Sequence, residues 1–283
     1  MQRKRPRRPP PHRPSNRPDQ RASHRPPQRP ATREQGEELR ISGLRAVEAL
    51  FRRDPDAILR LYLDRPMAQK AGAICHYLAE RRRGYAIKDA VELAKIAGTQ
   101  HHGGIVAVRA ERAPRVPAAA EIDAWAGERL PVLVMDGVGN PHNFGAILRS
   151  AAFLGVETVV LSERKEQALP SPAAYRVAEG GLEFVALWRP ASLPAFCRDL
   201  ARRYRVIGAA ARGTPLDALK PSDPRNPNAL PVALVLGNEE TGLSPPVAKA
   251  CSELVAIPGH ADRVDSLNDS VAAGILIHAL LRR

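Results

Sequence analysis

Cysteine is scarce in this chain of 283 residues. Cys75, Cys197 and Cys251 are odd in number, far apart and without the spacing of a zinc site. We therefore expect a reduced, cytoplasmic protein without disulfide bonds or a bound metal. The chain also lacks any run of about 18 to 20 apolar residues and an apolar N-terminal core. The sequence thus predicts neither a membrane-spanning helix nor a signal peptide.

Acidic residues are too few to balance the basic ones, since 43 Lys and Arg face 30 Asp and Glu, a net charge of +13. Such an excess indicates a polyanionic partner or an acidic membrane surface. Residues 1–38 hold 11 Lys and Arg against four Asp and Glu, together with nine of the 27 prolines and almost no aliphatic side chains. A segment of this composition cannot form a core, so we predict a disordered basic tail.

The function of this tail stays open between three interpretations. It could simply keep the protein in solution, or serve as a mitochondrial-type targeting segment. The favoured interpretation is a mobile anchor for nucleic acid, because each Arg that contacts a phosphate releases counterions and makes binding depend on salt.

Both standard nucleotide fingerprints are missing. No G-x-G-x-x-G follows a strand and no G-x-x-x-x-G-K-[ST] occurs, which disfavours a dinucleotide site and a phosphate-binding P-loop. Apolar periodicity nevertheless predicts a small α/β domain over residues 39–112, followed by a linker or connecting helix over 113–129. Its predicted helices cover 42–53, with Ser42 as N-cap, 67–82 and 91–97, and its predicted strands cover 57–64 and 104–110.

A larger α/β domain is predicted over residues 130–283. The apolar run 130–138 is typical of a buried strand, and a helix over 144–154 and a strand over 157–162 complete a βαβ unit. Further predicted elements are strands over 205–211, 232–237 and 254–258 and a final helix over 267–281. This alternation predicts a mostly parallel sheet with helices on both faces.

Polar segments follow three of these strands: "GNPHNFGAILRS", "NEETGLS" and "GHADRVDSLNDS". Ligands of parallel sheets bind outside the carboxyl ends of the strands, where loops converge and helix N-termini offer free N–H groups. A site made of backbone loops, amides and Arg149 suits a nucleoside-like ligand, with the Arg facing an anionic group.

Each polar residue in these segments also has a structural interpretation. Asn143 stands where a helix N-cap belongs, and Ser266 or Asn268 could cap the last helix. Glu239 and Glu240 could complement the N-terminus of a helix that begins near residue 245. His142, which titrates near neutrality, is a conventional proton acceptor, but loop packing or an RNA contact is favoured for it.

The three segments, in this order, resemble the three motifs of the SpoU/TrmH family of AdoMet-dependent RNA ribose 2′-O-methyltransferases, which belongs to the SPOUT superfamily. The stretches "ISGLRAVEAL" and "HHGGIVAV" are similar to the beginning and end of that family's RNA-binding domain, which resembles ribosomal protein L30e. The resemblance therefore extends from about residue 40 to the end of the chain and leaves out only the tail.

The resemblance implies a SPOUT-type α/β fold with a C-terminal trefoil knot, which composition and periodicity alone do not predict. It implies an L30e-like domain over 39–112, a methyltransferase domain over 130–283, and a homodimer that binds AdoMet in the knot, with each active site near the subunit interface. The implied substrate is a ribose 2′-OH in structured RNA, with 23S-type rRNA favoured and tRNA possible.

The resemblance also implies roles for individual residues of this sequence. The implied catalytic residues are Asn143, Arg149, Glu239, Ser266 and Asn268. The implied cofactor-binding residues are Gly237, Ile257 and Leu267. The resemblance assigns Arg149 to activate the ribose hydroxyl, yet a guanidinium group is a poor proton acceptor. It could instead bind the neighbouring phosphate and stabilise the developing alkoxide.

Departures from the family's pattern occur in the third segment. The loop from Pro258 to Asp265 is polar and longer than usual, Asp269 replaces a small or aliphatic residue, and Asn140 stands where Asp is frequent. A remodelled cofactor loop would suit a rival function, that of a non-catalytic RNA-binding or ribosome-assembly factor. A hydrolase that uses Ser266 is a remote alternative, because no G-x-S-x-G elbow is present.

Overall fold

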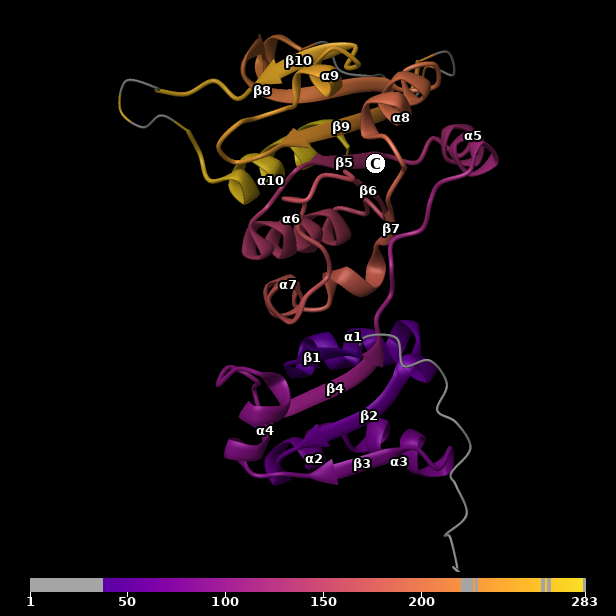
Figure 1. The fold of residues 1–283 in the computed structure, drawn as a ribbon, viewed down its shortest axis with the longest axis vertical. Helices are drawn as coiled ribbons and strands as arrows, with labels where there is room; N and C mark the ends of the chain where they lie inside the picture. Colours follow the sequence, from indigo (N-terminus) through magenta and orange to yellow (C-terminus); the bar gives the residue numbers. More distant parts are fainter. Residues whose placement is uncertain (1–37, 220–225, 227–228, 261–262, 264–265, 282–283) are drawn as a thin grey trace, which may run out of the picture. The chain divides into compact units, whose positions relative to one another are not determined.

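Two separate β-sheets organise the chain (Figure 1). The computed structural model describes residues 38–219, 226, 229–260, 263 and 266–281, and Gly36–Arg283 group as one compact unit. The basic tail predicted over residues 1–38 therefore lies, except for Glu38, outside the described residues. No helix in the described ranges is long and apolar enough to cross a membrane.

The first sheet has four strands in the order β1-β4-β2-β3. It confirms the predicted strands over 57–64 and 104–110, and adds two strands that apolar periodicity did not predict, β1 and β3. The strands are β1 (Glu38–Ser42), β2 (Ile58–Leu63), β3 (Gly84–Ile87) and β4 (Ile105–Ala110), and the helices are α1 (Leu44–Arg53), α2 (Arg65–Lys70), α3 (Gly72–Glu80) and α4 (Ala90–Ala97).

Two local predictions for this region are wrong. Ser42 is the last residue of β1 rather than a helix cap, and Gly43, whose φ is 95°, occupies the N-cap of α1 without a side-chain hydrogen bond. The helix predicted over residues 67–82 is divided at Ala71 into α2 and α3. Gly72 directly follows this break, and glycine disfavours a continuous helix.

The second sheet has six strands in the order β10-β8-β9-β5-β6-β7, and every neighbouring pair is parallel. The predicted parallel sheet is thus confirmed. The strands are β5 (Val132–Asp136), β6 (Thr158–Leu161), β7 (Ala186–Trp188), β8 (Arg205–Pro215), β9 (Val232–Gly237) and β10 (Glu253–Ala256). Strand β8 runs four residues beyond its predicted end at residue 211.

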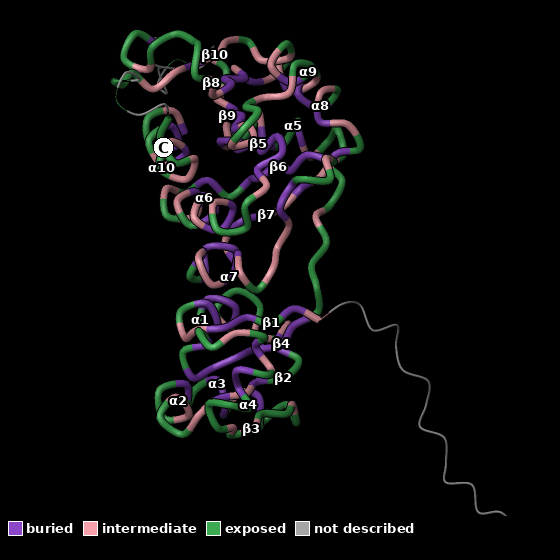
Figure 2. The backbone as a smooth tube through the Cα atoms, turned by 60° about the vertical axis from the view of Figure 1, so that its left-hand side comes forward, coloured by how far each residue is buried: buried purple, intermediate pink, exposed green. Residues whose placement is uncertain are grey.

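Helices cover both faces of this sheet, because its central strands are apolar on both sides. Leu133 and Met135 of β5 pack with helices α6 (Pro141–Phe153) and α10 (Asp269–Leu280). Val132 and Val134 pack on the opposite face with α5 (Ala119–Gly127), α8 (Leu193–Leu200) and α9 (Pro245–Ala248). Figure 2 shows the resulting buried layer in purple along β5, β6 and β9.

The segment predicted over residues 113–129 as a linker or connecting helix contains α5. Its Trp125 meets Trp188 of β7 edge to face, with ring centroids 5.0 Å apart. Helix α7 (Pro172–Ala178) and a 3-10 turn, η2 (Gly181–Phe184), follow β6 and pack against both α1 and α6. Residues 172–184 therefore connect the first sheet with the helix that follows β5.

Candidate active site

The first polar segment forms a tight corner between β5 and α6. Asn140 is the N-cap of α6, and its Oδ1 accepts a hydrogen bond from the His142 amide at 2.8 Å. Pro141 occupies the first turn, where its missing N–H is tolerated. The suggestion that Asn143 caps this helix is therefore wrong. Because Asn140 caps the helix, the Asn143 side chain can contact other segments.

Glu239, in the turn after β9, holds this corner together. Its Oε2 accepts a hydrogen bond from the Gly139 amide at 3.2 Å, and its Oε1 accepts from the Asn140 amide at 3.2 Å and from Asn143 Nδ2 at 3.3 Å. Glu239 thus binds at the beginning of α6, and the suggestion that it complements the helix near residue 245 is wrong. Burial alone would raise the pKa of Glu239, but hydrogen bonds from its own amide, Gly139, Asn140 and Asn143 lower it overall.

Asn268 brings the third segment to the same place. Its Nδ2 donates to Asn143 Oδ1 at 3.2 Å, and its Oδ1 accepts from the Ser270 amide at 3.0 Å, which caps α10 as the sequence suggested. Glu239, Asn143 and Asn268 therefore form a continuous chain of hydrogen bonds across all three polar segments. Ser266 is exposed and makes no hydrogen bond to any residue that the structure describes.

Two residues that the sequence analysis did not single out support this arrangement. Asn238 Nδ2 donates to the Gly137 carbonyl at 2.9 Å, and its Oδ1 accepts from the Glu240 amide at 3.0 Å, which shapes the turn after β9. Asp136, buried at the end of β5, accepts from the Ser244 amide at 2.7 Å. A polar residue at the end of an apolar strand, or directly after it, is the sequence signal that points to both residues.

Arg149 lies apart from this chain of hydrogen bonds. Six residues along an α-helix correspond to about 600° of rotation and about 9 Å of rise, so Arg149 and Asn143 project from different sides of α6. The Arg149 side chain is 52% exposed, and its Nη1 lies 3.2 Å from Oε1 of Glu179. The guanidinium is thus accessible from solvent and has a carboxylate partner that the sequence analysis missed.

The implied cofactor residues follow the strands at the same edge of the sheet. Gly237 ends β9, Ile257 comes directly after β10, and Leu267 precedes α10. Beside them, Asp269 Oδ2 is buried without a hydrogen-bond partner in the described part of the chain. Burial raises the pKa of Asp269, and the nearby charge of Glu239 raises it further.

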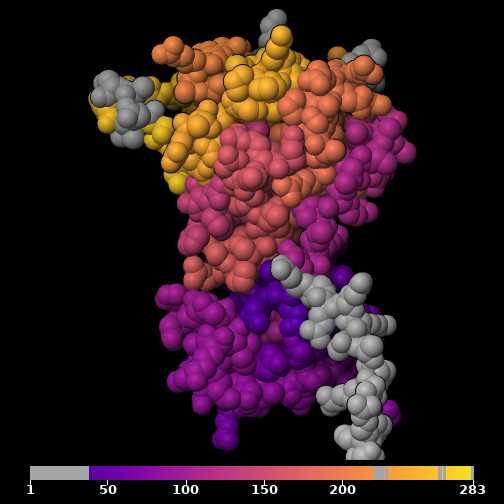
Figure 3. All heavy atoms as spheres, viewed as in Figure 1, coloured from indigo at the N-terminus to yellow at the C-terminus, as the bar shows by residue number. Residues whose placement is uncertain are grey.

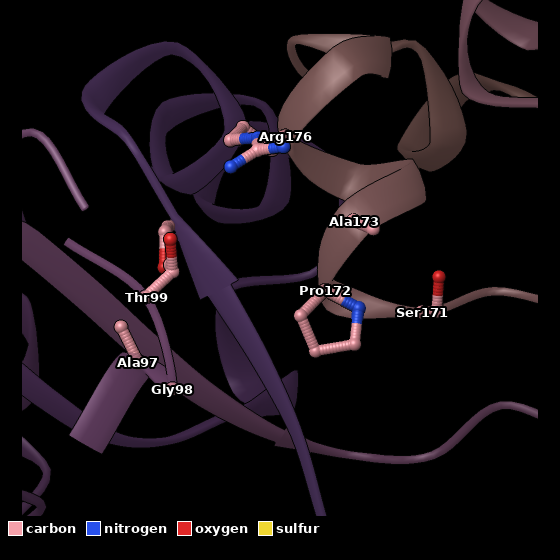
Figure 4. A pocket seen from close by; sticks show the side chains of 8 residues that line it. Ala97, Gly98, Thr99, Ser171, Pro172, Ala173 and Arg176 are labelled. Carbon is pink, nitrogen blue, oxygen red and sulfur yellow. The ribbon is translucent and has the colours of Figure 1, made fainter. Parts of the chain in front are cut away.

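A crevice of about 300 Å³ lies elsewhere, between the α4–Gly98 region and the beginning of α7 (Figure 4). It is lined by Ser42, Ala97, Gly98, Thr99, Ser171, Pro172, Ala173 and Arg176. None of the residues singled out as catalytic or cofactor-binding lines it. The candidate site formed by the three polar segments is therefore separate from this crevice.

Comparison with known proteins identifies the family of this chain. Residues 131–278 match the SpoU rRNA Methylase family, and residues 40–114 match the RNA 2′-O ribose methyltransferase substrate-binding domain. The chain belongs to the SpoU rRNA Methylase family. The family resemblance and the predicted enzyme class, an RNA ribose 2′-O-methyltransferase, are thus confirmed.

Individual relatives agree with this assignment. The chain is 34% identical over 251 residues to the uncharacterized tRNA/rRNA methyltransferase YfiF of Escherichia coli O157:H7, covering 87% of this chain and 68% of that protein. It is 32% identical to the 23S rRNA (guanosine-2′-O-)-methyltransferase RlmB of Nitrosomonas europaea, covering 86% and 91%. The crystal structure of the SpoU methyltransferase AviRb from Streptomyces viridochromogenes with AdoMet superposes with a TM-score of 0.64 at 22% identity, covering 86% and 89%. This last likeness shows the shared fold.

Proposed function

We propose that this protein transfers a methyl group from AdoMet to a ribose 2′-OH of ribosomal RNA. The observation that carries the proposal is the hydrogen-bonded chain of Glu239, Asn143 and Asn268, which joins the three family motifs at the carboxyl edge of the parallel sheet. When bound, AdoMet supplies an activated methyl group on a sulfonium leaving group. The protein's part is then to align the hydroxyl with that methyl and to manage the hydroxyl proton.

The edge of the sheet suits AdoMet chemically. Glu239 and Asp269, whose Oδ2 has no hydrogen-bond partner among the described residues, place two carboxyl groups near one another, which favours a cationic ligand such as a sulfonium. We assign Gly237, Ile257 and Leu267 to the cofactor, because they follow β9 and β10 and precede α10 at this edge. We expect no metal to take part, since displacement at a sulfonium methyl needs none.

We assign complementary roles to the five implied catalytic residues. The exposed guanidinium of Arg149 binds the phosphate next to the target ribose and stabilises the developing alkoxide. Glu239, Asn143 and Asn268 hold the loops that surround the reacting hydroxyl. Ser266, which is exposed beside Asn268, is assigned a contact with substrate or cofactor.

Ribosomal RNA is the substrate class we propose. RlmB of Nitrosomonas europaea is named a 23S rRNA methyltransferase, and the substrate-binding match over residues 40–114 supports an RNA-binding role for the first sheet. We propose that residues 39–112 are an L30e-like substrate-binding domain, residues 113–129 a connection, and residues 130–283 the methyltransferase domain with its trefoil knot. A location in the cytoplasm stays a prediction.

The exposed face of α10 supports a homodimer. Val271 and Ile275, one turn apart on this helix, are large apolar residues at the surface, and Leu267, before the N-cap of the helix, is also exposed. Phe153, at the end of the neighbouring α6, is 88% exposed. Large apolar residues exposed on neighbouring helices are typical of an interaction surface. Figure 3 shows the C-terminal part of the chain, in yellow, at the molecular surface.

Replacing Val271 by Arg is expected to convert the dimer into a monomer, because a charge would be buried without a partner at the interface. Light scattering after size-exclusion chromatography measures the effect as a halved molar mass. Val91→Arg is the matched control, since Val91 is exposed on α4 of the first sheet. An unchanged mass in Val271→Arg would contradict the proposed interface.

Replacing Glu239 by Gln is expected to lower the turnover number about 100-fold, because an amide cannot accept all four hydrogen bonds that the carboxylate accepts and small misplacements of reacting groups are costly. Glu240→Gln is the control, since the Glu240 side chain is exposed and has no hydrogen bond or ion pair within the described residues. As the pKa of Glu239 is lowered, its contribution is complete at neutral pH and is lost only as the pH falls through that lowered pKa. Equal turnover of the two variants would contradict the assignment.

The rival function, a non-catalytic RNA-binding factor, is tested by two measurements on the full chain. Calorimetric titration with AdoMet should give saturable binding of one cofactor per chain. Labelled methyl should then pass from AdoMet to unmodified ribosomal RNA more efficiently than to unmodified transfer RNA. RNA binding without AdoMet binding would support the rival, and preferential labelling of transfer RNA would overturn the proposed substrate class.

A further inference from the structure

Glu179 occupies a position that disfavours its side chain. It follows the last turn of α7 with φ 44° and ψ 41°, a left-handed conformation that normally favours Gly or Asn. A negative charge at a helix C-terminus is also repelled by the helix dipole. The local backbone conformation therefore does not explain why a glutamate occupies this position. The explanation lies in the contacts of its side chain.

Two arginines from different parts of the chain contact the Glu179 carboxylate. Arg149 Nη1 of α6 lies 3.2 Å from Oε1, and Arg45 Nη1 of α1 donates a hydrogen bond to Oε2 at 2.8 Å. One oxygen thus faces the proposed catalytic guanidinium, and the other faces the helix that follows β1. Glu179 directly bridges the region matched as substrate-binding and the catalytic helix.

The two glycines after Glu179 fix this bridge in place. A Cβ atom at Gly180 would lie 2.6 Å from Ala49 Cβ, and a Cβ at Gly181 would lie 2.9 Å from Arg149 Cα. Gly180 also has φ 95°, which few other residues adopt. The backbone of residues 180–181 therefore packs closely between α1 and the turn of α6 that contains Arg149. Neither glycine could carry a side chain without a shift of one of these helices.

We propose that Glu179 is a positioning residue for Arg149 and that Arg45 holds Glu179 in place, so that the substrate-binding region sets the geometry of the catalytic arginine. This inference rests on the proposed function, because its expected consequence is a change in the rate of methyl transfer. RNA that binds the first sheet and moves α1 would alter the orientation of the Arg149 guanidinium through this carboxylate.

The exposure of the three side chains makes the proposal testable without loss of the fold. Their exposed fractions are 77% for Arg45, 38% for Glu179 and 52% for Arg149. Ion pairs this exposed contribute little to stability. Substitutions at Glu179 and Arg45 should therefore leave the thermal midpoint nearly unchanged while they alter the orientation of Arg149.

The kinetic test compares Glu179→Gln with Glu157→Gln, because Glu157 is exposed and its carboxylate has no hydrogen bond or ion pair among the described residues. Glu179→Gln is expected to lower kcat about tenfold with little change in KM for RNA, because orientation rather than binding is lost. Arg45→Ala should lower kcat in the wild-type background but not in the Glu179→Gln background. A kcat for Glu179→Gln that equals or exceeds that of Glu157→Gln would overturn the proposal.

A second readout does not depend on activity. The Nε–Hε resonance of Arg149, assigned by its disappearance in Arg149→Lys, is expected to shift and lose order in Glu179→Gln and Arg45→Ala but not in Glu157→Gln. An unchanged resonance in Glu179→Gln would overturn the positioning role even in an active enzyme. If the wild type transfers no methyl to RNA while the resonance responds as expected, the proposed function fails and the positioning contact stands.

Discussion

Arg149→Ala is expected to lower the rate of methyl transfer about 1,000-fold or more, while AdoMet binding stays at the wild-type level. Arg149 is the one long charged side chain between Gly145 and Leu154, and its guanidinium is half exposed beside Glu179. Removal of a donor that stabilises developing negative charge typically costs a factor of 100 to 1,000, and loss of the phosphate contact adds to it. Single-turnover assays with saturating AdoMet measure the rate.

Arg149→Lys separates the two roles that Arg149 could have. Lysine keeps the charge but loses the planar, bidentate fork, so a large loss is expected if the guanidinium binds phosphate. Near-wild-type turnover would mean that any cation suffices. The matched control is Arg176→Ala, which removes an arginine of α7 that lines the crevice and has no assigned role in the reaction. An Arg149→Ala variant as active as Arg176→Ala would contradict the catalytic assignment.

Glu183→Ala is expected to lower the free energy of unfolding by about 3 to 5 kcal/mol, because it leaves Arg109 charged and buried without its partner. Arg109 Nη1 of β4 donates to both carboxylate oxygens of Glu183 in η2, at 2.9 and 2.7 Å, and the two side chains are only 5% and 3% exposed. Burial alone would lower the pKa of Arg109, but the charge and hydrogen bonding of Glu183, together with Tyr175 and Asp54, raise it overall. Burial, reinforced by Glu183, also raises the pKa of the neighbouring Tyr175.

Urea denaturation followed by circular dichroism measures this loss. Glu92→Ala is the control, because its exposed pair with Lys88 should contribute less than about 1 kcal/mol. The double variant Arg109→Met, Glu183→Leu should recover much of the stability, since apolar residues of similar volume replace a buried ion pair well. A loss in Glu183→Ala no larger than that in Glu92→Ala would contradict a structural role for this pair.

The second sheet could be predicted from the sequence because its strands are buried on both faces. Residues 132–136 and 232–237 are continuous apolar runs, and such runs are typical of central parallel strands. Strand β3 was missed because its side chains are largely exposed and carry no apolar periodicity. Its position depends on pairing with β2, over 20 residues away, which local patterns do not encode.

The sequence predicted where in the fold the candidate site lies, but not which of its side chains contact one another. The order of the polar segments placed Asn143, Glu239 and Asn268 at one edge of the sheet, yet their side-chain partners lie about 100 residues apart in sequence. Local rules therefore assigned Glu239 to the nearest helix and Asn143 to a cap. Glu179 was missed for the same reason, since one of its arginines lies 134 residues away.

The most direct test of the central claim is to map the labelled methyl after transfer from AdoMet to unmodified ribosomal RNA by the full-length protein. A 2′-O-methyl ribose blocks alkaline cleavage of the following phosphodiester, so digestion should yield a single labelled, alkali-resistant dinucleotide that is absent with Arg149→Ala. Label in alkali-sensitive mononucleotides would place the methyl on a base and contradict ribose methylation. Label that persists with Arg149→Ala would contradict the site proposed for it.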